Sequence, residues 1–177
     1  MCKFRDLKAE EIDVRVAMVT ENGCSLLLYK DARVDMDILD ETVGSLNWRR
    51  EHTRNNANCI VSIWDEKKEQ WISKEDTGTE SNTEKEKGLA SDSFKRACVN
   101  WGIGRELYTS PFIWIKAEDV RLIDKNGKKS TLDKFSVEKI VIQNKIIKAL
   151  AIKNISTNKR VYVYNTLAET KESKKDE

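Results

Sequence analysis

The chain has 177 residues, of which 32 are Lys or Arg and 30 are Asp or Glu, so the formal net charge is only +2. Its hydrophobic share of 39% is enough for a core, because a chain of this length can bury roughly 70% of its unfolded surface. No apolar run approaches the roughly 18 residues needed to span a bilayer, and the charged N-terminus lacks the apolar stretch of a secretory signal. We expect a soluble, cytosolic protein.

The first third of the chain predicts two helices separated by a strand. Residues 4–18 have apolar side chains at approximately helical spacing, and the apolar run 24–29 is typical of a strand. Asp31 is placed to cap a second helix, which we expect to end at Gly44. The apolar positions of the two predicted helices are Phe4, Leu7, Ile12 and Val16 in the first, and Val34, Ile38 and Leu39 in the second.

The middle of the chain predicts a β-meander followed by a long helix. Residues 48–54, 58–64 and 70–74 are typical of three antiparallel strands joined by short turns. The helix spans 84–101 and ends before Gly102. Capping boxes are available from Ser81 with Glu84 and from Thr83 with Glu86. One stripe of the helix forms its core face: Ala90, Phe94, Ala97, Cys98 and Trp101.

The last third predicts β structure and is basic. We expect strands at 112–116, 138–143, 145–152 and 160–164, with a turn at Asn126-Gly127. Residues 120–160 have 11 basic and 3 acidic side chains, whereas residues 57–80 have 3 basic and 6 acidic ones. Such a basic region either attracts polyanions by counterion release or supplies lysines that solvate exposed hairpins. Charge alone does not choose between the two readings.

Several enzyme and metal-site classes have no support in the sequence. The four cysteines form no C-x-x-C pair, so a zinc knuckle is not expected. His52 is the only histidine, and no nucleophile motif accompanies it. No phosphate-binding P-loop is present. We therefore expect no cofactor and no nucleotide hydrolysis.

Basic side chains near the first helix–strand unit are candidate phosphate ligands, because guanidinium groups form paired hydrogen bonds with phosphate. Neighbouring tryptophans are either stacking platforms for bases or core residues of a small sheet. In the long helix Lys95 flanks the apolar stripe, and Arg96 is predicted on the opposite face, within reach of Asp92. The candidates near the first unit are Arg33, Arg49, Arg50 and Arg54, with Trp48, Trp64 and Trp71.

Three segments carry a resemblance to a known family. They are KDARVDMDILDETVGSLNWRR (30–50), WISKEDTGT (71–79) and EKEKGLASDSFKRACVNWGIGRELY (84–108). The last follows the pattern K-G-x-x-S-D-x-x-K-R-A-x-x-x-W-G-I-G-R-x-L-Y. Together they resemble the Rad-fifty-two family of single-strand annealing proteins, most closely its phage branch known as Sak. The likeness spans roughly residues 4–110, and the chain from Pro111 onward resembles nothing that we recognise.

The resemblance implies an α+β fold in which an antiparallel β-meander packs on a long helix, as a β-β-β-α core over residues 1–110. Outside the resemblance, charge and strand pattern predict that residues 111–167 form a basic, β-rich C-terminal extension, and polar composition predicts a disordered tail at 168–177. Proteins of this family form oligomeric rings or helical arcs. They hold single-stranded DNA by its backbone and anneal complementary strands without ATP, so the chain would be no enzyme.

The family's DNA groove corresponds to three residues here: Arg33, Lys95 and Arg96. Where some members have a further basic residue, this chain has Val99, so we expect Arg105, Arg49 or Arg54 to take over part of the phosphate grip. A second DNA contact has no clear match, and Lys67, Lys68 and Lys87 are the candidates. The resemblance also implies a phage or prophage origin, action inside a bacterial cell, and a single-strand-binding protein or an exonuclease as further partners.

Two other functions remain open from the sequence. One is a metal-dependent nuclease that uses carboxylates of the second predicted helix as Mg²⁺ ligands, although on a helix three of them share one solvated face. The other is a module that binds double-stranded RNA or protein. The carboxylates are Asp35, Asp37, Asp40 and Glu41.

Overall fold

The computed structural model describes residues 3–79 and 85–167, with only the backbone described for 85–87. The chain is a mixed α+β protein with antiparallel sheets, which confirms the predicted class. It divides into two compact units, one formed by Asp31–Arg105 with the segment up to Asp6, the other by Leu7–Lys30 with the chain from Glu106 onward. This division does not follow the predicted boundary at residue 110, because the chain enters the second unit twice. The predicted capping residues Ser81, Thr83 and Glu84 and the predicted disordered tail 168–177 lie outside the described residues.

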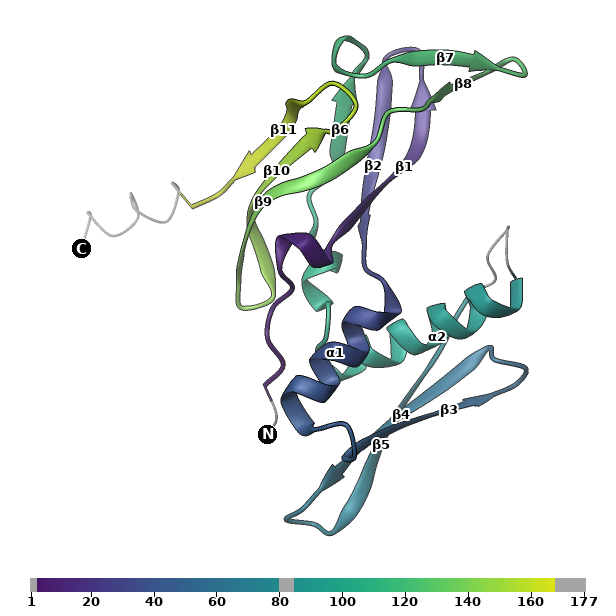
Figure 1. Ribbon diagram of the computed structural model, residues 1–177, viewed down its shortest axis with the longest axis vertical. Coiled ribbons are helices and arrows are strands. Elements are labelled where there is room, and N and C mark those ends of the chain that lie inside the picture. The colour runs from purple at the N-terminus through teal and green to yellow at the C-terminus, as the bar shows by residue number, and fades with distance from the viewer. Residues whose placement is uncertain (1–2, 80–84, 168–177) are drawn as a thin grey trace, which may run out of the picture. The chain divides into compact units, whose positions relative to one another are not determined.

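The first unit contains two helices and a three-stranded sheet (Figure 1). Helix α1 begins after Asp31, whose side chain accepts a hydrogen bond from the Arg33 backbone N–H, and it ends at Gly44 with φ 85°. That backbone angle suits glycine and confirms the predicted helix end. The elements are α1 (Ala32–Val43), β3 (Trp48–Thr53), β4 (Asn58–Asp65), β5 (Gln70–Thr77) and α2 (Lys85–Trp101).

Helix α2 buries the predicted stripe, with Phe94, Ala97 and Cys98 fully buried. Trp48 of β3 stacks on Phe94 at 6.1 Å between ring centroids. The indole N–H of Trp101 donates to the Val61 carbonyl of β4. Gly78 packs so closely that a Cβ there would lie 2.5 Å from the Ser93 backbone nitrogen, so only glycine fits at this approach.

The second unit is built on a six-stranded sheet in the order β11-β10-β9-β1-β2-β6, with a separate β7–β8 hairpin. The Tyr162 hydroxyl of β11 donates to the Phe112 carbonyl just before β6, so the two outer strands of the sheet approach each other. The strands are β1 (Asp13–Thr20), β2 (Gly23–Tyr29), β6 (Ile113–Lys116), β7 (Leu122–Lys125), β8 (Lys128–Thr131), β9 (Phe135–Gln143), β10 (Ile146–Asn154) and β11 (Lys159–Asn165).

The prediction of a helix over 4–18 is wrong. Residues 9–11 form a single 3₁₀ turn, and Asp13–Thr20 is strand β1, which pairs with β2 and β9. The segment alternates Val14 and Val16 with polar neighbours at period two, and β-branched residues favour strands. The predicted turn at Asn126-Gly127 is confirmed, with strands β7 and β8 on either side of it.

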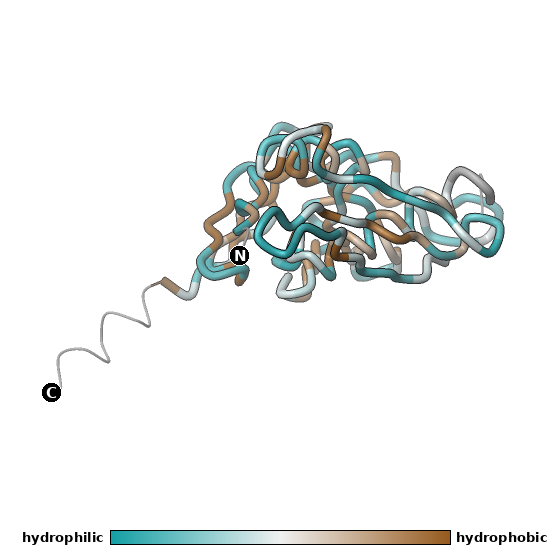
Figure 2. The backbone as a smooth tube through the Cα atoms, turned by 90° about the horizontal axis from the view of Figure 1, so that it is seen from below, coloured by the Kyte–Doolittle hydropathy of each residue, from teal (hydrophilic) through white to brown (hydrophobic). Residues whose placement is uncertain are grey.

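Figure 2 shows hydrophobic and hydrophilic stretches alternating along the chain, as expected when each element buries one face. Among residues 3–79 and 85–167, no helix is both long and apolar enough to cross a bilayer.

Candidate nucleic-acid interface

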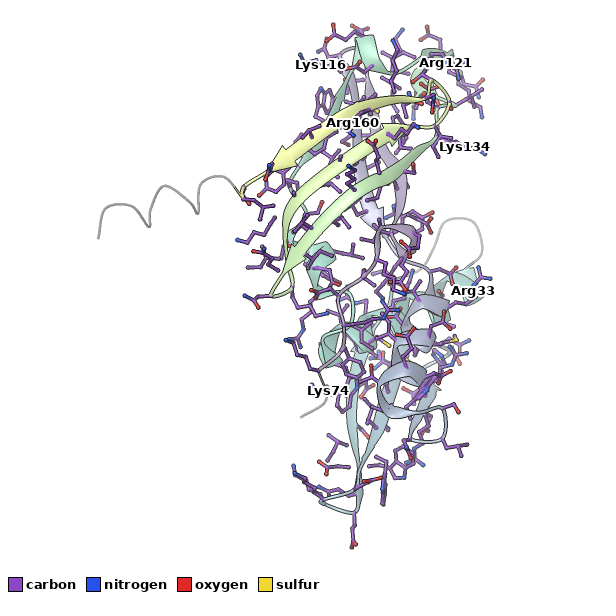
Figure 3. The ribbon with its side chains drawn as sticks, turned by 60° about the vertical axis from the view of Figure 1, so that its left-hand side comes forward. Arg33, Lys74, Lys116, Arg121, Lys134 and Arg160 are labelled. Carbon is purple, nitrogen blue, oxygen red and sulfur yellow. The ribbon has the colours of Figure 1, made fainter. Side chains whose placement is uncertain are left out.

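Arg33 projects from the first turn of α1, with 82% of its side-chain surface accessible. Its guanidinium donates to both carboxylate oxygens of Asp31, at 2.9 and 3.3 Å. Figure 3 labels it at the N-terminal end of that helix. The N-terminal end of a helix favours anions, so Arg33 and the helix dipole act in the same direction.

Lys95 of α2 lies close to the same carboxylate. The pKa of Asp31 is lowered first by the hydrogen bond from the Arg33 guanidinium and then by the Arg33 backbone N–H, with further contributions from the charges of Arg33 and Lys95. The Asp31 carboxylate is thus bonded by Arg33 of α1 and feels the charge of Lys95 of α2, while Asp37 of α1 also acts on Arg33. We call Asp31, Arg33 and Lys95 the α1–α2 basic site.

Arg96 does not join this site. Its Nε lies 3.4 Å from Asp76 Oδ1 on β5, so the side chain reaches the meander and not α1. Asp92, which helical spacing places within reach of Arg96, accepts hydrogen bonds from the backbone and hydroxyl of Thr79. The adjacent Lys95 and Arg96 thus lie near different carboxylates, Asp31 and Asp76.

The other predicted arginines are spread over the first unit. Arg49 lies with its guanidinium 4.5 Å from the Trp71 ring centroid. Arg54 lies in the β3–β4 turn with φ 51°. Arg105 donates to the carbonyls of Val99 and Asn100, closing the C-terminal end of α2. None of these contacts brings an arginine to the α1–α2 basic site.

The lysine candidates are less defined. Lys87 lies in the first turn of α2, and its side chain is outside the described residues. Lys67 and Lys68 lie in the β4–β5 turn, where their backbone N–H groups donate to Asp65. Both lysines lie at exposed positions of this turn, and the hydrogen bonds to Asp65 use only their backbone N–H groups.

Sequence reasoning missed Lys74. Its ammonium donates to the Asn100 carbonyl at 2.7 Å and lies 4.5 Å from the Trp101 ring centroid. Arg50 similarly lies 4.9 Å from the Phe94 ring centroid. Each lies two positions after an apolar residue of its strand, Trp48 and Ile72, and this spacing could have placed both on the helix-facing side of the sheet. They stabilise the packing of α2 and are not free for a ligand in this arrangement.

The carboxylates proposed as Mg²⁺ ligands are dispersed. Asp35 is fully buried, Asp40 accepts from the Trp48 indole at 2.6 Å, and Glu41 pairs with Arg5. Within the described ranges, no group of three His, Cys, Asp or Glu side chains is placed to hold a metal ion.

In the basic second unit, several cations are already paired within the unit. Arg121 bonds Asp133, Lys129 bonds Asp124 and Lys145 lies 3.6 Å from Glu106. Glu106 is fully buried and also accepts the Leu7 backbone N–H at 2.7 Å. These ion pairs neutralise part of the positive charge of the second unit.

Comparison of the chain with protein-family models, with curated proteins and with solved structures returns no match in any of the three.

Proposed function

We propose that the protein binds single-stranded DNA by its phosphates and anneals complementary strands without ATP. The observation that carries the proposal is the α1–α2 basic site, where an exposed arginine at a helix N-terminus bonds the Asp31 carboxylate and a lysine of the neighbouring helix lies close enough for its charge to act on the same group. The two positions are those that the resemblance to single-strand annealing proteins assigns to the DNA groove.

The chemistry of this site fits a backbone ligand. Guanidinium and ammonium groups bind phosphate oxygens, which position a strand but carry no sequence information. A strand held in this way keeps its base edges free, so a complementary strand can pair with it. No covalent bond forms or breaks, and the protein acts by holding one strand in a conformation that is ready to pair.

The finer features of the family belong to the same proposal. We take β3, β4, β5 and α2 as its β-β-β-α core, and we propose that copies of the chain assemble into a ring or helical arc along the strand. Three of the other candidates, Arg96, Arg49 and Arg105, would contact DNA only after leaving the intramolecular contacts they make here. Arg54 is exposed but lies apart in the β3–β4 turn, so we assign the primary contacts to Arg33 and Lys95.

The test is a strand-annealing assay with complementary fluorescent oligonucleotides and no nucleotide added. The wild-type chain should accelerate duplex formation, and the double variant Arg33→Glu/Lys95→Glu should not. Lys116→Glu is the matched control, because Lys116 is also exposed and paired with a single carboxylate, Glu118.

Equal annealing by the wild type and the double variant would overturn the assignment of the site. Absence of acceleration by the wild type would overturn the function. Cleavage of the oligonucleotides with added Mg²⁺ would instead favour the nuclease reading, and tighter binding to double-stranded RNA would favour the duplex-binding reading.

A further inference from the structure

The meander has one face that α2 does not cover. Successive side chains of a strand point to opposite sides, and Trp48 of β3 contacts α2 through Phe94. The adjacent Arg49 therefore points away, where it lies over Trp71 of β5. We call this side the meander outer face. It consists of Arg49, Glu51, Ile60, Ser62, Trp64, Trp71, Ser73 and Glu75.

The meander outer face has an acidic row at one end and an aromatic pair at the other. Glu51, Ile60 and Glu75 are register partners across the three strands, so the two exposed carboxylates flank one isoleucine. Two strand spacings separate these carboxylates by roughly 10 Å. Arg49, Ser62 and Ser73 form the next row, and beyond it Trp64 and Trp71 meet edge to face at 5.6 Å.

The second unit presents a face of opposite charge on β9, β10 and β11. Lys139, Ala151 and Val163 are register partners across these strands, and Lys153 pairs with Arg160 one step along. Figure 3 labels Arg160 here, with Lys134 near the start of β9. We call Lys139, Ala151, Lys153, Arg160 and Val163 the basic sheet face.

Charge on the basic sheet face is concentrated around the carboxylate of Glu138. Both Nε and a terminal nitrogen of Arg160 donate to it, at 2.6 and 2.9 Å. The pKa of Glu138 is lowered first by that hydrogen bonding, and the charges of Arg160, Lys153 and Lys139 add to the effect. Arg160 thus bonds this anion and the charges of Lys139 and Lys153 act on it, while Val163 on β11 is 65% exposed.

We propose that the meander outer face of one copy docks on the basic sheet face of a second copy. Glu51 and Glu75 would face the cations, and Ile60 would cover Val163, since Ala151 is already buried within its own unit. The contact joins two different surfaces, so it is head-to-tail and can continue from copy to copy. The inference rests on the assembly part of the proposed function and names the surfaces that make it.

A second copy fits the basic sheet face better than nucleic acid does. The exposed apolar side chain of the face is Val163, and the tyrosines of the same strand, Tyr162 and Tyr164, pack against the core of the unit. Among the described residues of this face no aromatic ring is left to stack on a base, which is the usual partner of a basic groove for single strands. An exposed apolar side chain among cations fits a protein surface that presents carboxylates on either side of an isoleucine.

The experiment reverses the charges of each face in the full chain. Variant A is Glu51→Lys/Glu75→Lys, and variant B is Lys139→Glu/Lys153→Glu. Sedimentation velocity at low salt should show that each variant alone associates at least about tenfold more weakly than the wild type, because like charges then face each other. An equimolar mixture of A and B, and the chain with all four changes, should regain association.

Matched controls change the same charges elsewhere. Glu10→Lys/Glu21→Lys and Lys125→Glu/Lys128→Glu alter exposed residues that belong to neither face and should leave association unchanged. If variant A or B fails to fold by circular dichroism, Glu51→Gln/Glu75→Gln and Lys139→Gln/Lys153→Gln replace them, with a smaller loss of association because the attraction is removed without adding repulsion.

The proposal is overturned by a wild type that stays monomeric, by variants that associate like the wild type, or by a mixture that does not recover. Loss of oligonucleotide binding by variant B with unchanged association would assign the basic sheet face to nucleic acid instead. If association responds to the charge reversals as expected but the chain does not anneal DNA, only the proposed function is refuted. If the chain anneals DNA but association does not change with these charges, only the interface is refuted.

Discussion

Replacing Arg33 with alanine should weaken single-strand binding without disturbing the helix that carries it. The helix cap uses the Arg33 backbone N–H, which donates to Asp31 at 2.8 Å and which alanine retains. The side chain is exposed and pairs with Asp31, and exposed ion pairs contribute little to stability. Lys95→Ala removes the second cation of the α1–α2 basic site, from the middle of α2, where alanine is a good helix former.

The magnitude follows from counterion release. Removing one phosphate contact with a single strand lowers the slope of log K against log salt by about 0.7. Between about 50 and about 200 mM salt, a fourfold change, one such interaction is therefore worth about 2.5-fold in affinity and two are worth about sevenfold. The wild type should lose about seven times more affinity than the double alanine variant over that range.

The assay is fluorescence anisotropy with a short labelled oligonucleotide, titrated at several salt concentrations, with Lys116→Ala as the control of similar exposure. The slope of log K against log salt is divided by the number of protomers bound, so that assembly along the strand does not change the comparison. The reasoning is refuted if both single variants and the double variant show the wild-type slope while Lys116→Ala also leaves it unchanged.

Four further outcomes are expected. Asp31→Asn should keep the helix cap but free Arg33 and Lys95 from their carboxylate, so it should tighten single-strand binding in the same anisotropy assay; equal or weaker binding contradicts this. Glu106→Ala should destabilise the fold by about 2 kcal/mol in urea unfolding, because it removes a fully buried carboxylate and leaves the Leu7 backbone N–H without its acceptor. Gly78→Ala should cost about 2 kcal/mol in the same measurement through its clash with α2; a neutral result would disprove the close approach. Burial raises the pKa of Asp133, but hydrogen bonds from Arg121 and Asn154 outweigh burial and leave the pKa lowered. The contribution of Asp133 to stability should therefore be present above about pH 3.9 and be lost as the pH falls below that value. In unfolding curves taken from neutral to acid pH, Asp133→Asn should reduce this loss of stability.

Local patterns predicted the first unit well. Asp31 and Gly44 bracket α1 as their capping preferences require, and the stripe through Phe94 is buried as its spacing predicts. These signals are local, because caps and helical spacing act within one or two turns. The same holds for the strands of the meander, whose turns are short.

Features that depend on distant residues were not predicted from the sequence. Residues 13–20 form β1 because β2 and β9 pair with them, and the β9 partner lies far along the chain. At the candidate site, helical spacing placed Lys95 and Arg96 on different sides of α2, but nothing local showed that Asp76 would hold Arg96. The proximity of Lys95 to Asp31 likewise depends on how α1 meets α2.

The two passages of the chain through the second unit set an order for folding during synthesis. Strands β1 and β2 are made early, but their sheet neighbours β9 and β6 follow only after the whole first unit. At the usual rate of chain elongation this delay is on the order of ten seconds. The first unit can fold as soon as it emerges, whereas the nascent β1–β2 hairpin must wait with Leu26 and Cys24 unburied, which makes it the segment that most needs chaperone protection in the growing chain.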